Sequence, residues 1–237
     1  MKHKRLLILA SGTAIVVVAG ILAGPPVYRW LRTEIRRSPH VLDWINHPEQ
    51  HTEWAVQAGQ RCGDAPFILP TSGFIGYLWD DSFRPFHHHQ GIDIFGGTDV
   101  GITPVVAAYP GYLTRRPDWK STLAIRIPDD PLQPGRQIWA YYTHMATPDG
   151  TPLIAANFPP GTSEVYVEAG TLLGTQGNYS GTPGNPVGVH LHFSIVLDDH
   201  KGWLRNELNI HNTLDPSPYL GIDVNANSNN GQVEACK

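Results

Sequence analysis

The chain has little charge and little sulfur for its length. Of its 237 residues, 16% are Asp, Glu, Lys or Arg, and the formal net charge is −4. This weak negative charge argues against nucleic acid as the main partner. The two cysteines, Cys62 and Cys236, do not have the spacing of zinc ligands, so a metal site here has to be built from His and Asp. In an exported chain they can form one disulfide, and two free thiols are the alternative that the sequence leaves open.

Glycine, proline and aromatic residues are plentiful instead, with 24 Gly, 21 Pro and 10% aromatic residues. That balance is typical of a turn-rich β protein rather than a helical one. We therefore predict a mainly β fold, an antiparallel β-sheet or sandwich-like domain. The candidate strands are Val105–Ala108, Tyr112–Arg115, Thr122–Ile127, Ile138–Thr143, Val165–Val167 and Val189–Val196.

A long apolar run stands near the N-terminus, from Leu6 to Gly24, with basic residues on both sides. At about 1.5 Å per residue it spans about 28 Å, close to the hydrocarbon thickness of a bilayer. We predict a transmembrane helix that serves as an uncleaved signal anchor, with a cleaved signal peptide as the alternative. The chain would then cross the cytoplasmic membrane once, with its domain outside the cytoplasm.

The whole chain divides into four predicted parts. Residues 1–37 comprise the anchor and a basic juxtamembrane segment, and residues 38–66 a helical linker of one or two short helices, broken near Pro48. Residues 67–222 form the main domain. Residues 223–237 are rich in Asn and poor in apolar side chains, which predicts a mobile tail.

Two short motifs carry the chemistry. One places His89 and Asp93 four positions apart around Gly91, and the other places His190 and His192 two positions apart. On a strand, residues i and i+2 point to the same face, so His190 and His192 are expected to face one place. Three imidazole or carboxylate ligands, with a fourth position left for water, are the pattern of a catalytic zinc site.

These motifs and two others resemble those of the M23 family, the zinc endopeptidases of the lysostaphin and LytM type, which cut peptides in bacterial peptidoglycan. The family's H-x-G-I/V-D, Y-x-H-L/M, glycine-rich and H-L-H-F elements stand here in the family's order. Four ordered elements are far more specific than one. One departure is Ser194, which follows H-L-H-F where the family often has an acid or an amide. The matching stretches are His89–Asp93, Tyr142–Met145, Val167–Asn178 and His190–Phe193, and the similarity extends from about Pro70 to Leu220.

The resemblance implies a LytM-type fold and one zinc ion per chain, held by His89, Asp93 and His192 together with water. It implies that His144 and His190 are catalytic imidazoles that do not bind the metal. Histidine suits that work because its unperturbed pKa of about 6.5 lies near the pKa of about 7 of zinc-bound water. Which of the two is the base and which stabilises the oxyanion stays open.

The resemblance also places a substrate groove along two loops. The first comprises residues 73–86 and includes Tyr77 and Trp79, and the second comprises residues 179–188. The aromatic side chains of the first loop could equally be ordinary packing.

Each site residue also has a simpler interpretation. The run His87–His89 could bind metal adventitiously, Asp93 could cap a turn, and His144 could be an exposed residue at the end of a strand. The spacing to Gly91 and Asp93 is what singles out His89 from that run.

The predicted function is a zinc-dependent endopeptidase that hydrolyses stem or cross-bridge peptides of bacterial peptidoglycan, in wall remodelling or lysis. One alternative is a non-catalytic M23-like regulator of other wall hydrolases, in which one or more ligands would be missing. Another is a zinc carboxypeptidase on wall peptides, which needs a longer spacer between the first His and the Asp. A third is a metal buffer or sensor that uses His87–His89.

Overall fold

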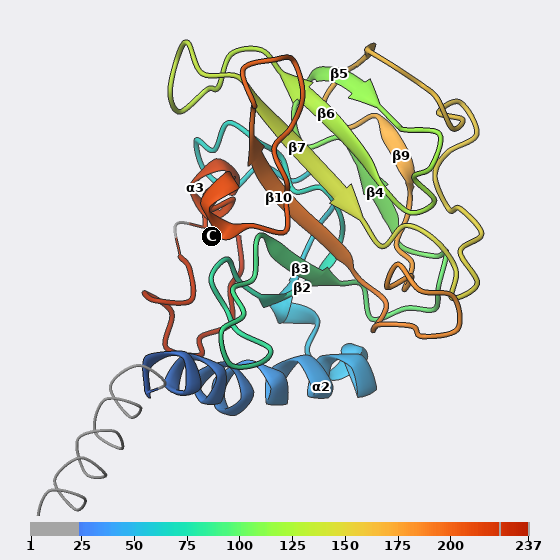
Figure 1. The fold of residues 1–237 in the computed structure, drawn as a ribbon. Helices are drawn as coiled ribbons and strands as arrows, with labels where there is room; N and C mark the ends of the chain where they lie inside the picture. The colour runs from blue at the N-terminus through green and yellow to red at the C-terminus, as the bar shows by residue number, and fades with distance from the viewer. Residues whose placement is uncertain (1–23, 223, 237) are drawn as a thin grey trace, which may run out of the picture.

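The computed structural model describes residues 24–222 and 224–236. An antiparallel sheet of nine strands dominates it, in the order β1-β2-β3-β10-β7-β6-β5-β8, with β11 paired to β10 (Figure 1). The sheet strands are β1 (Ala55–Val56), β2 (Gly73–Tyr77), β3 (Ile92–Phe95), β5 (Gly111–Thr114), β6 (Leu123–Ile127), β7 (Ile138–Thr143), β8 (Val165–Val167), β10 (Leu191–Leu197) and β11 (Thr213–Leu214). A second sheet pairs β4 (Pro104–Val106) with β9 (Leu172–Thr175). The mainly β prediction is therefore confirmed.

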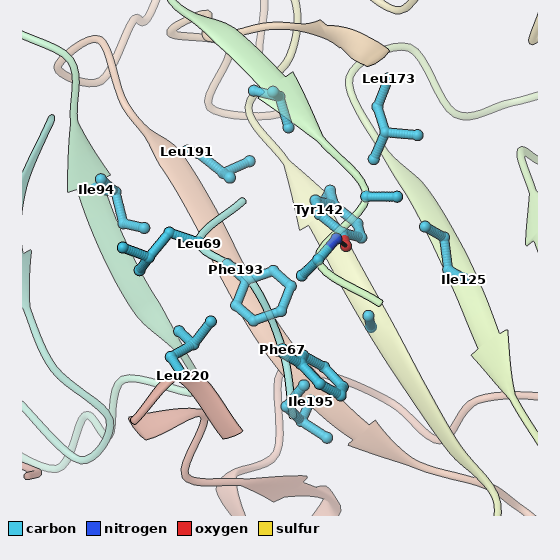
Figure 2. Packing of buried hydrophobic residues seen from close by; sticks show 14 of the residues in the cluster. Phe67, Leu69, Ile94, Ile125, Tyr142, Leu173, Leu191, Phe193, Ile195 and Leu220 are labelled. Atoms are coloured by element: carbon cyan, nitrogen blue, oxygen red, sulfur yellow. Dashed lines mark hydrogen bonds between the residues drawn. The ribbon is translucent and has the colours of Figure 1, made fainter. Parts of the chain in front are cut away.

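Period-2 alternation along β10 separates the core from the opposite face of the sheet. Leu191, Phe193 and Ile195 belong to the main hydrophobic core, where they lie beside Phe67 and Leu69 (Figure 2). All five are fully buried, and burying an aliphatic or aromatic side chain of this size contributes roughly 1.5–3 kcal/mol. The intervening positions of β10, starting with His192, face the other side, so the packing of the core fixes which way the imidazole points.

The predicted strands agree with the structure most closely in the middle of the domain. The bounds of β7 and β8 are those predicted, whereas β10 begins at Leu191, two residues later than expected. Five strands were missed: β1, β2, β3, β9 and β11. The prediction that residues 73–86 form a groove loop is therefore wrong for residues 73–77, because the short glycine-bearing run of β2 acquires its strand conformation by pairing with β1 and β3.

The predicted linker is helical, and it packs closely against the sheet. Residues 24–36 are helical and lead into α2 (Ser38–Asn46), which is followed by the short 3-10 turns η1 (Pro48–Gln50) and η2 (Thr52–Trp54). The helix ends before Pro48, as expected. Val41 and Trp44 are buried in a second hydrophobic cluster with Phe74 and Phe95. Because β1 also lies in this segment and pairs with β2, the predicted boundary at residue 67 divides the sheet.

The predicted anchor, Leu6–Gly24, lies outside the described residues except for its last residue. In residues 24–222 and 224–236, no helix is both long and apolar enough to cross a membrane.

The C-terminal segment differs from the predicted mobile tail. Cys236 forms a disulfide with Cys62, which settles the alternative that the sequence left open. Between Val224 and this bond, Ala226 and Asn229 are 2% and 4% exposed. The side chain of Asn229 accepts a hydrogen bond from the backbone of Gly231 at 2.7 Å. The polar composition wrongly suggested a mobile segment. Asparagine side chains form hydrogen bonds with the nearby backbone, and the disulfide holds the segment against the domain. Two further short elements, η3 (Ile210–Asn212) and α3 (Ser217–Leu220), precede this segment.

Candidate metal centre

Three of the predicted ligands converge at one end of the sheet. Asp93 on β3 and His192 on β10 are direct cross-strand partners, so their side chains emerge side by side on the same face. His89 Nε2 lies 3.0 Å from Asp93 Oδ1 and 3.0 Å from His192 Nδ1, and His192 Nδ1 lies 2.8 Å from Asp93 Oδ1. All three side chains are buried, and in the described part of the chain they form a group able to hold a metal ion.

Gly91 explains how the loop that carries His89 reaches the strand that carries His192. A Cβ atom at this position would lie 2.2 Å from the carbonyl oxygen of Phe193, which no side chain tolerates. Only glycine lets the backbone before β3 approach β10 this closely. The glycine of the H-x-G-I/V-D motif is thus a packing requirement that brings the two histidines within reach of each other.

Hydrogen bonds orient both imidazole rings. His89 Nδ1 lies 2.9 Å from the carbonyl oxygen of Leu78, which requires a proton on Nδ1 and leaves Nε2 as the free acceptor. His192 Nε2 lies 2.9 Å from Glu207 Oε1, which leaves Nδ1 as its inward-facing nitrogen. Partners of this kind fix the tautomer and orientation of metal-binding histidines.

Glu207 was missed by the sequence analysis. It lies between β10 and β11, and its carboxylate also accepts a hydrogen bond from Ser194 Oγ at 3.1 Å. The only signal in the sequence was indirect: Ser194 stands where the resembled family often has an acid or amide. Nothing in the residues around Glu207 marks it as a site residue, because a loop delivers it from 13 positions further along the chain.

Burial and mutual charge act against each other in this cluster. Burial alone would raise the pKa of Asp93, but His89, His190 and His192 hold it well below its usual value. Burial alone would lower the pKa of His192, but hydrogen bonds to Asp93 and Glu207 raise it to about 10. Burial would likewise raise the pKa of Glu207, and His192 outweighs it and lowers that pKa. The carboxylates are therefore charged at neutral pH and stabilise a cation between them.

The donor set fits zinc. Two imidazole nitrogens and one carboxylate oxygen are ligands that zinc prefers in catalytic sites with a place left for water. Zinc bonds of about 2.1 Å in tetrahedral geometry hold donors about 3.4 Å apart. The separations of 2.8–3.0 Å between the three donors need to widen by only a few tenths of an ångström.

His144 and His190, the predicted catalytic imidazoles, lie beside the ligands. Their ring centroids are 4.6 Å apart, and His190 Nε2 is 3.6 Å from Asp93 Oδ1. Each Nδ1 lies 2.7 Å from a backbone carbonyl oxygen, that of Tyr179 for His144 and that of Gly188 for His190. These bonds place the proton on Nδ1 and leave Nε2 able to accept a proton.

Both of these imidazoles are neutral at neutral pH. Burial is the main cause that lowers their pKa values, and the neighbouring histidines lower the pKa of His144 further, to about 3. His144 also has a φ of 70°, a conformation that is strained by about 1–3 kcal/mol in a residue other than glycine. The simpler interpretation of His144 as an exposed residue does not agree with this half-buried and strained position.

Gly177, from the glycine-rich motif, connects the segments that carry these two histidines. Its carbonyl oxygen accepts the backbone hydrogen bond of His190 at 3.1 Å. A Cβ atom here would lie 2.4 Å from the carbonyl oxygen of His144. The backbone segments that carry Gly177, His144 and His190 can therefore approach this closely only with glycine at position 177.

The site opens into a cleft of about 760 Å³. Of the two predicted groove loops, the second lines it through Tyr179, Val187 and their neighbours, whereas the first contributes Tyr77 but not Trp79. The indole of Trp79 instead donates a hydrogen bond to Thr213 Oγ1 at 3.0 Å. A third wall, which the sequence analysis did not predict, comes from α2.

The other two histidines of the run His87–His89 lie apart from the ligands. His88 Nδ1 pairs with Asp80 Oδ1 at 2.6 Å, and Arg29 contacts the same carboxylate oxygen. His87 reaches the edge of the cleft, where burial lowers its pKa to about 4. The structure thus separates His89 from its two neighbours, as the spacing to Asp93 predicted.

No family model and no curated protein matches this chain. Among solved structures, it is similar to one named as the glycyl-glycine endopeptidase lytM of Ruminococcus gnavus, with 25% identity and a TM-score of 0.36 over 60% of this chain and 48% of that one. This chain thus spans about half the length of that protein. It is also similar to a mutant catalytic domain of the prophage-encoded M23 protein EnpA from Enterococcus faecalis, with 22% identity and a TM-score of 0.33 over 64% of this chain and 96% of that one. Neither similarity is close enough to transfer an activity.

Proposed function

We propose that the chain is a zinc-dependent endopeptidase that hydrolyses stem or cross-bridge peptides of bacterial peptidoglycan. One observation carries the enzymatic part: three buried donors converge on one point, and two neutral imidazoles that are not among them face the same point from the wall of an open cleft. A purely structural zinc site has four protein ligands and no such neighbours. Peptidoglycan as the substrate rests on the motif resemblance.

In this proposal His89, Asp93 and His192 hold the zinc ion. When bound, zinc supplies Lewis acidity that polarises the peptide carbonyl and lowers the pKa of water to about 7. His144 and His190 each present a neutral Nε2 to the cleft. One would accept the proton of the attacking water at Nε2 and pass it to the leaving amine, and the other would donate to the oxyanion after taking up a proton from the solvent in the open cleft. Their backbone partners at 2.7 Å keep each ring in the orientation that this exchange requires.

Two features favour this function over its alternatives. A non-catalytic regulator has no use for two neutral imidazoles that line the cleft beside the three donors, one of them at a strained backbone position, and all five predicted site residues are present. A carboxypeptidase binds the terminal carboxylate of its substrate, for which a guanidinium or ammonium group is the usual partner. Among the described residues that line the cleft, none is Arg or Lys. An endopeptidase needs no such cation.

The test is digestion of purified peptidoglycan by the zinc-loaded protein, with the products identified by mass spectrometry. New amino termini within stem or bridge peptides, lost on chelation and restored by zinc, are the expected result. His144→Ala and His190→Ala are expected to keep one zinc per chain and lose at least about a hundredfold in rate. Release of only terminal residues would support the carboxypeptidase instead, and no release by a fully zinc-loaded protein would contradict the enzymatic function.

The location of the protein outside the cytoplasm and the anchor at Leu6–Gly24 stay predictions from the sequence. They agree with a substrate that lies outside the cytoplasmic membrane.

A further inference from the structure

Large apolar side chains gather where the cleft opens. Leu42 and Ile45 of α2 are 59% and 42% exposed, and Val187 in the loop before His190 is 37% exposed. All three line the cleft. Leaving such side chains in water costs free energy that a bound apolar group would recover.

The wall that α2 provides is held rigidly in place. Val41 and Trp44 of the same helix are buried, and the indole nitrogen of Trp44 donates a hydrogen bond to the carbonyl oxygen of Phe95 at 2.7 Å. Residues three apart on a helix share a face, so Leu42 and Ile45 project together, next to this buried side. A preformed apolar wall binds with less loss of conformational entropy than a mobile one.

This wall lies next to one of the proposed catalytic imidazoles. A Cβ atom built on Gly188 would be 3.8 Å from Ile45 Cδ1 and 3.4 Å from the ring of Phe95. Gly188 also accepts the hydrogen bond from His190 Nδ1, and the Phe95 ring stacks on His190 with centroids 4.9 Å apart. A group resting against Ile45 would therefore lie close to His190, one of the two proposed catalytic imidazoles.

The residues that line the cleft argue against a charged substrate side chain beside Leu42 and Ile45. Its only described carboxylates, Asp93 and Glu207, are paired with imidazoles, and no Lys or Arg is among the described residues that line it. An acidic side chain would find no Lys or Arg among these residues, and a basic one would be desolvated against leucine and isoleucine without a free carboxylate.

We infer that Leu42, Ile45 and Val187 form a subsite that receives an aliphatic side chain of the substrate peptide, adjacent to the bond that is cut. This inference rests on the proposed function. It assigns the substrate class of that same cleft: uncharged peptides with an aliphatic residue beside the scissile bond.

The test uses a short peptide that the protein cleaves, prepared with Leu, Gly or Lys in turn on each side of the scissile bond. The wild-type protein is expected to prefer Leu over Gly at one of the two positions by about tenfold or more in kcat/KM, chiefly through KM, and to disfavour Lys. The double variant Leu42→Ser, Ile45→Ser is expected to reduce the Leu-to-Gly ratio about tenfold while keeping one zinc per chain. Val187→Ser probes the loop side of the subsite without changing the helix and should reduce the same ratio.

Ile35→Ser is the matched control, because Ile35 is 70% exposed on the preceding helical segment and does not line the cleft. It should retain the wild-type ratio. If neither the α2 variant nor Val187→Ser changes the ratio although the wild-type protein cleaves, the subsite is wrong and the proposed function stands. If the zinc-loaded wild-type protein cleaves no peptide, the proposed function fails and the subsite falls with it.

Discussion

The site is assembled from two kinds of support, strands and loops. Asp93 and His192 sit opposite each other on β3 and β10, where the ladder of the sheet fixes both backbones. His89 and His144 lie outside the strands, in segments whose positions depend on contacts with distant parts of the chain. The comparison shows that one half of the site is specified by strand pairing, and the other half by long-range packing.

The loop that carries His89 is fastened to the N-terminal helical segment. Asp81 accepts the backbone hydrogen bond of Leu78 at 2.8 Å, and Leu78 in turn holds the His89 ring. Thr33 donates its hydroxyl to Asp81 at 3.3 Å and accepts the backbone hydrogen bond of Ser82 at 3.0 Å. The predicted juxtamembrane segment and linker therefore help to position His89, a proposed metal ligand, and form a wall of the cleft.

The largest effect on zinc binding is expected from changing Asp93, which lies on strand β3. Asp93 lies within hydrogen-bonding distance of both other ligands, so Asp93→Ala should lower zinc affinity by more than about a hundredfold, since loss of an outer partner alone costs about 10- to 100-fold. Zinc stoichiometry after dialysis measures this directly. His87→Ala, outside the ligand cluster, should retain one zinc per chain, and full zinc in the Asp93 variant would contradict the ligand assignment.

A smaller loss of zinc affinity is expected at Glu207, a loop residue that bonds the proposed ligand His192 on strand β10. Glu207→Ala removes the acceptor for His192 Nε2 and should lower zinc affinity about 10- to 100-fold, measured by competition with a chelator. Glu207→Gln keeps an oxygen acceptor and should recover part of the loss. Equal affinities for the Ala variant and the wild-type protein would mean that the sheet alone orients His192.

The lowered pKa of His144 predicts a dependence of stability on pH in the metal-free protein. Below about pH 6.5 the unfolded chain protonates His144, whereas the folded chain does so only near its lowered pKa of about 3. The free energy of unfolding should therefore fall as the pH falls through this window, by up to about 1.4 kcal/mol per pH unit from this group.

Denaturant unfolding of His144→Gln between pH 7 and 4 should give a shallower slope than the wild-type protein. His47→Gln is the control, because His47 is exposed and should leave the slope unchanged. An unchanged slope for His144→Gln would mean that its ring is accessible to protons in the folded protein.

The smallest effect is expected at Thr33, whose hydroxyl links the N-terminal helical segment to the loop that carries His89. Thr33→Val keeps the volume but removes the hydroxyl that Asp81 and Ser82 share, which should destabilise the chain by about 1–2 kcal/mol and weaken zinc binding a few-fold. Calorimetric unfolding and zinc titration of the same sample measure both. Thr52→Val, at an exposed position, should change neither. Unchanged zinc binding in a destabilised Thr33 variant would separate the helix from the metal site.

Local patterns in the sequence were enough for the mainly β fold, for the bounds of β7 and β8, and for the choice of His89 over His87 and His88 as the residue beside Asp93. These features follow from periodicity and spacing over a few residues, which act through the geometry of a single strand. The same locality explains why the pair His190 and His192 could be expected to face one place.

Other features were decided only by the tertiary structure. Three of these features join positions that lie 13 to about 150 residues apart. They are the contacts of Glu207, the hydrogen bond between Thr33 and Asp81, and the wall that α2 adds to the cleft. No local sequence pattern encodes contacts over such separations. The C-terminal segment is the sharpest case, because its composition is that of a mobile chain, yet the disulfide between Cys62 and Cys236 and its own asparagine hydrogen bonds keep it packed. Pairing, burial and cross-linking across the chain set these features, since their free energy depends on which residues meet in space rather than on which are neighbours in sequence.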